Sequence, residues 1–226
     1  MLQKRDPLFL QAYEVIKDKI LRGTLVPGER LVETTLARDL GVSRNPIREA
    51  LMLLMQDGLV HSTASGHIVH PMTIDDIQEI YECRMMVEPF AASLASQRIQ
   101  PSEISTLYRY IDQAESCFAS GDIDGTIQAN SSFHNSIVQF SQNQLVYSTF
   151  KMIDNLVVVS RNIEMKVHHR PPNYLGEHRE MVSLLEARKS HELHELVMDH
   201  IRADWNYFKK FSEASEKELL MVNAAQ

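Results

Sequence analysis

The sequence predicts a mainly α-helical protein in two parts: residues 1–71 form a small helical unit with one short hairpin, and residues 72–226 form an all-α antiparallel bundle of about six helices. Apolar residues recur at helical spacing through most of the chain, and the only alternating pattern typical of strands lies within residues 59–70. The charge also changes at Pro71, since nine Lys and Arg face eight Asp and Glu before it, and 14 face 22 after it. A chain of 226 residues that is 44% hydrophobic is long enough for two packed domains.

The composition excludes several classes of protein. The two cysteines, Cys83 and Cys117, are too few for a disulfide framework and form no Cys-x-x-Cys pair, so we expect both to be reduced thiols. No apolar run approaches the roughly 18 residues that cross a bilayer, and the first residues lack the pattern of a signal peptide. We therefore expect a cytoplasmic protein of a bacterial type with no membrane partner. The net charge of −7 means that any binding to nucleic acid must come from a local basic surface in residues 1–71.

Residues 1–71 show the order of elements of a winged helix-turn-helix. The second helix ends at Gly41, which suits a helix C-terminus, and Ser43 is a good N-cap for the third. Two helices joined by a three-residue turn form a DNA-reading unit, and the hairpin after them would be the wing. The predicted elements are helices at residues 8–22, 33–40 and 43–57, and strands at 59–62 and 67–70.

The third predicted helix carries the functional argument. With its apolar face turned inward, Arg44, Asn45 and Arg48 are left outward on the first two turns. Arginine can donate two hydrogen bonds to guanine and asparagine can pair with adenine, while the Ser43 hydroxyl and the helix N-terminus suit a phosphate. Each residue alone is more often an ordinary solvated side chain. The whole arrangement favours DNA binding.

The segment from Leu36 to Leu51, followed by Asp57-Gly58-Leu59-Val60 and a turn at Gly66, resembles the winged helix-turn-helix of GntR-family bacterial transcription regulators. The resemblance implies binding to double-stranded DNA. A two-fold homodimer reading two half-sites would require an inverted-repeat operator. The residues that the resemblance places at the operator are Ser43, Arg44, Asn45 and Arg48, with Thr34 or Thr35 and the wing residues Ser65 and Gly66 as lesser contacts.

The second part of the chain predicts an antiparallel helical bundle, a fold whose centre can hold a metal or a small ligand. Asn130 and His134 are four residues apart and share one helix face, and His178 and His200 lie among apolar residues at helical spacing. This spacing is not a zinc signature, and a lone histidine is more often a core residue than a ligand. The predicted helices cover residues 73–98, 101–119, 124–141, 144–166, 174–188 and 190–212.

Other histidines compete for the role of ligand. His168 and His169 stand beside a Pro-Pro loop, and His191 and His194 are three apart in a sequence that is not the His-Glu-x-x-His motif of zinc proteases. We expect these four to face solvent.

The segments Arg84–Pro89, Asn130–His134 and Glu177–Arg179, together with His200, resemble the FCD ligand-sensing domain of FadR-type GntR regulators. The count of six helices resembles its VanR-like subgroup. The resemblance implies a divalent metal, zinc or nickel, bound by His134, His178 and His200.

Asn130 stands where the FCD pattern usually has an aspartate. An amide oxygen is a neutral and weaker ligand than a carboxylate, so we expect lower metal affinity and a preference for an anionic effector such as an organic acid. Arg84 is the candidate to hold the anionic group of that effector. The alternative is an ion pair between Arg84 and Glu88, one helical turn away.

The sequence thus predicts a sequence-specific transcription regulator, a repressor rather than an enzyme, whose DNA binding is modulated by a small molecule in the bundle. The alternative is a metal-dependent enzyme that uses the three histidines. It lacks a recognisable carboxylate base beside them and leaves the winged helix unexplained. A third possibility is a bundle that only binds other proteins.

Overall fold

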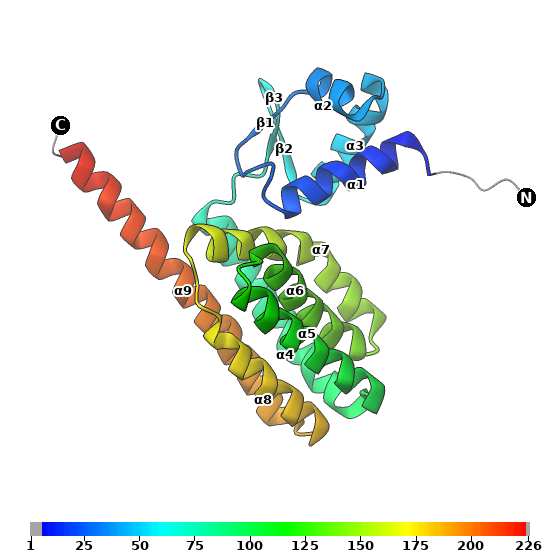
Figure 1. Ribbon diagram of the computed structural model, residues 1–226, viewed down its shortest axis with the longest axis vertical. Coiled ribbons are helices and arrows are strands. Elements are labelled where there is room, and N and C mark those ends of the chain that lie inside the picture. The colour runs from blue at the N-terminus through cyan, green and yellow to red at the C-terminus, as the bar shows by residue number, and fades with distance from the viewer. Residues whose placement is uncertain (1–5, 225–226) are drawn as a thin grey trace, which may run out of the picture. The chain divides into compact units, whose positions relative to one another are not determined.

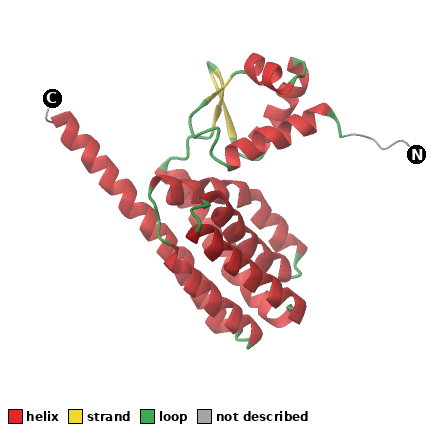
Figure 2. Cartoon of the chain, in the orientation of Figure 1, coloured by secondary structure: helices red, strands yellow, loops and turns green. Residues whose placement is uncertain are grey.

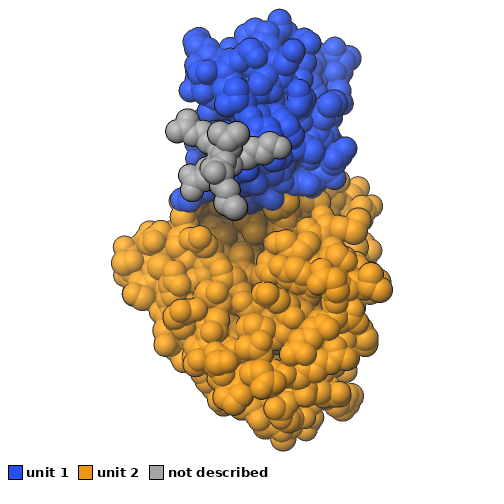
Figure 3. Space-filling view, turned by 90° about the vertical axis from the view of Figure 1, so that its right-hand side faces the viewer, with its two compact units in different colours: residues 1–73 blue, residues 74–226 orange. Residues whose placement is uncertain are grey.

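The computed structural model describes residues 6–224, and side chains as far as residue 212. The chain divides into two compact units, Met1–Thr73 and Ile74–Gln226 (Figure 3). The described residues are mostly helical, and one small sheet lies in the first unit (Figure 2). The predicted fold class is confirmed. Both cysteines are free thiols.

The first unit is a three-helix core with a three-stranded antiparallel sheet (Figure 1). Helices α1 and α3 pack together through fully buried side chains such as Ile16, Ile47 and Leu51. Only the strand at Arg30–Leu31 was not predicted, because two residues are too short to produce an alternating pattern. The elements are α1 (Leu8–Leu21), β1 (Arg30–Leu31), α2 (Glu33–Leu40), α3 (Arg44–Gln56), β2 (Val60–Thr63) and β3 (Gly66–Val69), with the strands in the order β1-β3-β2.

The turn between α2 and α3 depends on Gly41. This residue has φ 67° and ψ 30°, the left-handed conformation that glycine adopts without steric cost, and its N–H donates to the last carbonyls of α2. Ser43 occupies the N-cap position of α3, but its side chain makes no capping hydrogen bond. Ser43 is therefore the N-cap residue as predicted, and its exposed side chain does not supply the capping hydrogen bond.

The second unit is a bundle in which α4 is the central helix, packed against α6, α7, α8 and α9. Helix α5 packs against α6 and α8. Within the described residues no helix is both long enough and apolar enough to cross a membrane. The helices are α4 (Ile74–Arg98), α5 (Pro101–Ala119), α6 (Ile123–Phe140), α7 (Gln144–Asn162), α8 (Leu175–Glu186) and α9 (Ser190–Ala224).

Three segments of the bundle depart from the predicted helices. The last predicted turns of α7 widen into a π-helix, η1 (Ile163–Val167), and a short 3₁₀ turn, η2 (Pro172–Tyr174), precedes α8. Helix α9 also continues to Ala224, beyond its expected end near Ser212. π-Helical turns often occur at functional sites, and this one places the carboxylate of Glu164 in the core, where it is 3% exposed.

Candidate functional sites

The predicted recognition residues lie at the surface of the first unit. Arg44, Asn45 and Arg48 are exposed on the first turns of α3, and the side chains of the two arginines are each 55% exposed. They point outward because the opposite face of α3 is buried, with Ile47 and Leu51 at 0% exposure. This is the arrangement that the sequence predicts for a helix that reads DNA.

Glu33, in the first turn of α2, joins the two arginines. Arg44 donates from Nη2 and Arg48 from Nε to the same oxygen, Oε2 of Glu33, at 3.1 and 2.8 Å. Burial raises the pKa of this carboxyl, but the hydrogen bonds from the arginines outweigh it and lower the pKa below its ordinary value. The shared carboxylate holds both guanidinium groups in place on neighbouring turns of α3. Sequence analysis did not identify Glu33, since its partners are 11 and 15 residues away.

The wing also keeps its predicted residues at the surface. Ser65 and Gly66 are exposed at the turn between β2 and β3, and Gly66 has φ 122°, which a residue with a side chain rarely adopts. Arg30 donates to the carbonyl of Ser65 at 2.6 Å, and Thr63 donates to that of Gly66 at 2.9 Å. These bonds fix the conformation of the wing tip. Thr34 and Thr35 are exposed on α2.

Three histidines converge in the core of the second unit. His134 on α6, His178 on α8 and His200 on α9 each offer one ligand atom, and these atoms lie within 4.8 Å of one another. All three residues are at most 2% exposed. Asn130, one turn before His134, is 8% exposed, and its side-chain oxygen has no hydrogen-bond partner among the described residues. The four residues that the sequence analysis placed together are thus in one region of the core.

Two carboxylates orient the histidine rings from outside the cluster. His134 Nδ1 lies 2.8 Å from Glu88 Oε2, and His200 Nδ1 lies 2.6 Å from Glu177 Oε2. A neutral ring that donates from Nδ1 leaves Nε2 as an acceptor, and His134 Nε2 has no partner. Burial lowers the pKa of His134 to about 3 despite the Glu88 charge, and burial beside the other two histidines lowers that of His178 well below its ordinary value. These rings are neutral, as metal ligands must be.

Arg84 is fully buried and already paired. Its Nε donates to Glu88 at 2.6 Å, and its Nη1 donates to Asp204 at 3.4 Å. The ion pair with Glu88 that the sequence offered as an alternative is therefore present, although it is buried rather than exposed. The Arg84 guanidinium keeps the pKa of Glu88 well below its usual range although burial raises it, so the carboxylate is charged. Among the described residues, Arg84 Nη2 has no hydrogen-bond partner.

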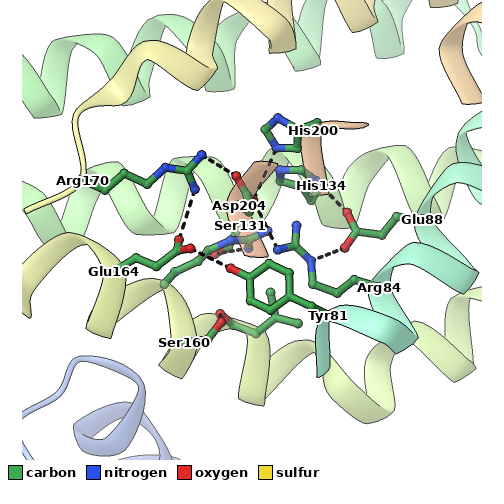
Figure 4. A network of polar contacts seen from close by, with 12 residues as sticks. Tyr81, Arg84, Glu88, Ser131, His134, Ser160, Glu164, Arg170, His200 and Asp204 are labelled. Carbon is green, nitrogen blue, oxygen red and sulfur yellow. Dashed lines mark hydrogen bonds and ion pairs between the residues drawn. The ribbon is translucent and has the colours of Figure 1, made fainter. Parts of the chain in front are cut away.

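The buried ion pairs of Arg84 belong to a larger polar network that continues from the histidines to residues of α9 and η1 (Figure 4). Asp204 forms ion pairs with Arg84 and with Arg170, the second at 2.5 Å, and Arg170 also pairs with Glu164 at 3.4 Å. The hydroxyl of Tyr81 donates to Glu164 at 2.7 Å. Asp204 stands four residues after His200, so the sequence could have predicted that the two side chains share one helix face. No sequence pattern predicts the contacts of Glu164 or Arg170.

Arg161, on α7, is a second buried guanidinium that sequence analysis missed. It is 3% exposed, its Nη1 donates to the Ser131 hydroxyl at 2.8 Å, and its Nη2 has no hydrogen-bond partner. In the sequence it is one arginine in an apolar helix, with nothing to distinguish it from a surface residue.

The competing histidines lie elsewhere. His169 and His191 are exposed as expected. The expectation is wrong for the other two: the His168 ring is half-buried against Phe208 and Phe211, and His194 lies half-buried with Nδ1 3.4 Å from the Ser93 hydroxyl. The His168 ring stacks on Phe211 and lies at a tilt against Phe208, both on α9.

Comparisons with known proteins agree with both halves of this description. Residues 8–66 match the model of bacterial regulatory proteins of the gntR family, and residues 79–203 match that of the FCD domain. The chain is 31% identical over 218 residues to the HTH-type transcriptional regulator YdhC of Bacillus subtilis, covering 96% of this chain and 97% of that protein. It is 29% identical to the Nta operon transcriptional regulator of Aminobacter aminovorans, over 88% of this chain and 93% of the other.

Solved structures share the fold. A GntR-type regulator from Rhodococcus sp. RHA1 superposes with a TM-score of 0.77 at 25% identity, covering 88% of this chain and 95% of that one. The McbR protein of Escherichia coli gives the same TM-score of 0.77 at 20% identity, covering 92% of this chain and 100% of the other.

A winged helix-turn-helix followed by a helical bundle is the architecture of a DNA-binding transcription regulator. The chain belongs to the GntR family and carries an FCD domain. The matched families and relatives are regulators, which confirms the prediction that the protein is not an enzyme.

Replacing Glu33 with glutamine should reduce the preference for specific DNA. The change removes the charge that holds Arg44 and Arg48, so the ratio of specific to non-specific affinity should fall about tenfold, while non-specific affinity rises because a negative charge near the phosphates is lost. Fluorescence anisotropy with specific and scrambled duplexes at one salt concentration measures both affinities. Glu49→Gln is the matched control, since it removes the same charge from an exposed position of α3. Equal ratios for the two variants would contradict the positioning role of Glu33.

Glu164→Gln should change how stability depends on pH. Burial and the charge of Asp204 raise the pKa of Glu164 to about 7, so the folded protein keeps a proton that the unfolded chain loses above about pH 4.3. The bound proton therefore contributes fully to the free energy of unfolding below about pH 4.3. This contribution of Glu164 falls as the pH rises to about 7 and does not change further above that. Melting temperatures measured across this range should fall less for Glu164→Gln than for the unmodified protein. The exposed Glu195→Gln is the control, and parallel curves for Glu164→Gln and the unmodified protein would contradict the assignment.

Proposed function

We propose that the protein is a homodimeric repressor of the bacterial cytoplasm that binds an inverted-repeat operator and responds to a small organic acid. The observation that carries the proposal is α3, whose packed apolar face leaves Arg44, Asn45 and Arg48 outward, with both arginines fixed by Glu33. Two half-sites follow from two copies of one recognition helix related by a two-fold axis. Repression is supported by the name of one relative, the transcriptional repressor RspR of Escherichia coli, which is 25% identical over 89% of each chain.

In this proposal the first unit reads the operator. Arg48 and Arg44 contact base edges. Asn45 contacts a base or the DNA backbone, and Ser43 contacts a phosphate at the N-terminus of α3. Lesser contacts come from Thr34 on α2 and from the wing. The wing contributes Ser65 and Gly66, whose backbone conformation is fixed by Arg30 and Thr63.

The second unit, within residues 72–226, is the effector-binding and dimerisation domain of this proposal, and its six α-helices among the described residues support the VanR-like subgroup. The residues present fit a divalent metal such as zinc or nickel. Three imidazoles converge, unsatisfied acceptors stand on His134 and Asn130 among the described residues, and carboxylates orient two of the rings.

His134, His178 and His200 would hold the metal, with the Asn130 oxygen as a further donor. When bound, such a metal supplies positive charge that attracts an anionic ligand. Because Asn130 is neutral, no aspartate charge at this position offsets the positive charge of the metal, and this favours an organic acid as effector. Arg84 has only its Nη2 available for that ligand, since Glu88 and Asp204 occupy its other side.

Arg48→Ala should remove operator preference while leaving the fold intact. Duplexes selected from a random library by the unmodified protein supply the operator, and loss of one base contact should cost about 1–3 kcal/mol of discrimination against a scrambled duplex. The control is Arg22→Ala, since Arg22 pairs with Asp18 at the end of α1. An unchanged ratio of the two affinities would remove Arg48 from the residues that read DNA.

The metal site makes a separate prediction. Asn130→Asp should tighten binding of zinc or nickel, because it adds a charged oxygen to a site that is already formed, and His178→Ala should weaken it about tenfold or more. Calorimetric titration of chelator-stripped protein measures both, with the exposed His191→Ala as the control. Normal binding after His178→Ala would mean that the three histidines are core residues.

A further inference from the structure

Arg161 carries a buried positive charge that forms no ion pair with any carboxylate of the described residues. Its guanidinium is 3% exposed, and one neutral hydroxyl, that of Ser131, accepts from it at 2.8 Å. The second terminal nitrogen, Nη2, has no hydrogen-bond partner in the part of the chain that the structure describes. Burial and the nearby charge of Arg84 lower the pKa of Arg161, and together they outweigh the charges of Glu88, Asp204 and Asp154, which raise it.

The carboxylates around Arg161 are occupied by other groups. Glu88 accepts from Arg84 and His134, Asp204 pairs with Arg84 and Arg170, and Asp154 accepts from Asn135 and Lys151. A buried charge without a partner is strongly destabilising, and an arginine keeps its proton under all ordinary conditions. Packing alone gives no reason to keep an arginine there, because an apolar side chain of similar length would fill the same space at lower cost.

Arg161 lies in the same region of the core as the histidine cluster. Arg161 reaches across from α7 to Ser131 on α6, which adjoins Asn130 and stands three residues before His134. Its charge also contributes to lowering the pKa of both His134 and His178. The unsatisfied atoms of Arg161, Asn130 and His134 therefore belong to one polar region of the core.

We propose that Arg161 selects the effector by its charge, donating from Nη2 to a carboxylate oxygen of an organic acid bound beside the three histidines. This inference rests on the proposed ligand-sensing function of the same site and adds a residue that the sequence did not assign. A guanidinium matches the planar carboxylate, and one unneutralised cation calls for one negative charge rather than the two of a phosphate. Arg84 contributes less to binding of the acid, because Glu88 and Asp204 already balance its charge.

The test compares acids with their neutral amides. Acetate, propionate and benzoate are each compared with the matching neutral amide, which is acetamide, propionamide or benzamide. Each compound is titrated at constant ionic strength into metal-free and zinc-loaded protein, and binding is followed by melting temperature and calorimetry. Inorganic phosphate is a separate arm. For the unmodified protein we expect at least one acid to bind, its amide to bind at least about tenfold more weakly, and phosphate to bind more weakly than the acid.

Arg161→Met is the decisive variant. It should lower the acid affinity about tenfold or more and raise the melting temperature of the ligand-free protein, because an unpaired charge leaves the core; a purely structural arginine would give the opposite change in melting temperature. Ser131→Ala, which removes the hydroxyl that holds Nη1, should weaken the acid several-fold and provides the test if Arg161→Met does not fold. Arg179→Met is the matched control, since Arg179 is a half-exposed arginine paired with Asp112 and Glu115.

Equal acid affinity in the unmodified protein and in the folded variants would overturn the inference. So would binding of an amide as tight as that of its acid, tighter binding of phosphate, or failure of every acid to bind the unmodified protein. These results are independent of the operator and metal experiments. A protein that binds no operator but binds an acid through Arg161 would contradict the proposed function and leave this inference standing.

Discussion

The burial of charge in the centre of the helical bundle is the constraint on which the rest of the second unit depends. Arg84, Glu88 and Asp204 are all at most 5% exposed, and a charge in such surroundings persists only if other charges or hydrogen bonds hold it. Glu88 therefore meets Arg84 on its own helix and His134 on α6, and Asp204 ties α9 to α4 and to Arg170. The same burial keeps the rings of His134 and His178 neutral, so that their nitrogens are available as ligands.

This network also connects the proposed ligand site in the core with other parts of the chain. It runs from the histidines through Asp204 and Arg170 to Glu164 on the π-helical turn, and from there to Tyr81 on α4. Helix α4 begins at Ile74, the first residue of the second unit, so a shift of α4 is passed directly to the chain that leads back to the DNA-binding unit. An anion at Arg161 alters the charge balance of the region, and the network can respond by moving helices or by taking up a proton on Glu164.

The helices could be predicted because periodicity and punctuation are local: Gly41 ends α2, and apolar residues at helical spacing mark every helix of the bundle. The two-residue strand β1 and the π-helical turn after Asn162 could not, because pairing with β3 and the packing of Glu164 determine them. For the sites, the convergence of His134, His178 and His200 came from a family resemblance, since their spacing alone is no metal signature. Glu33, Arg161 and Arg170 were missed because their roles come from partners on other helices or on loops.

The central claim is that one molecule senses an organic acid in its core and reads DNA with α3. The most direct test is the affinity of zinc-loaded protein for its selected operator, measured by anisotropy with and without the acid that binds most tightly. We expect saturating acid to weaken operator binding about tenfold, and operator DNA to weaken acid binding by the same factor, because coupling between two binding sites is reciprocal. Identical operator affinity with and without bound acid would contradict it.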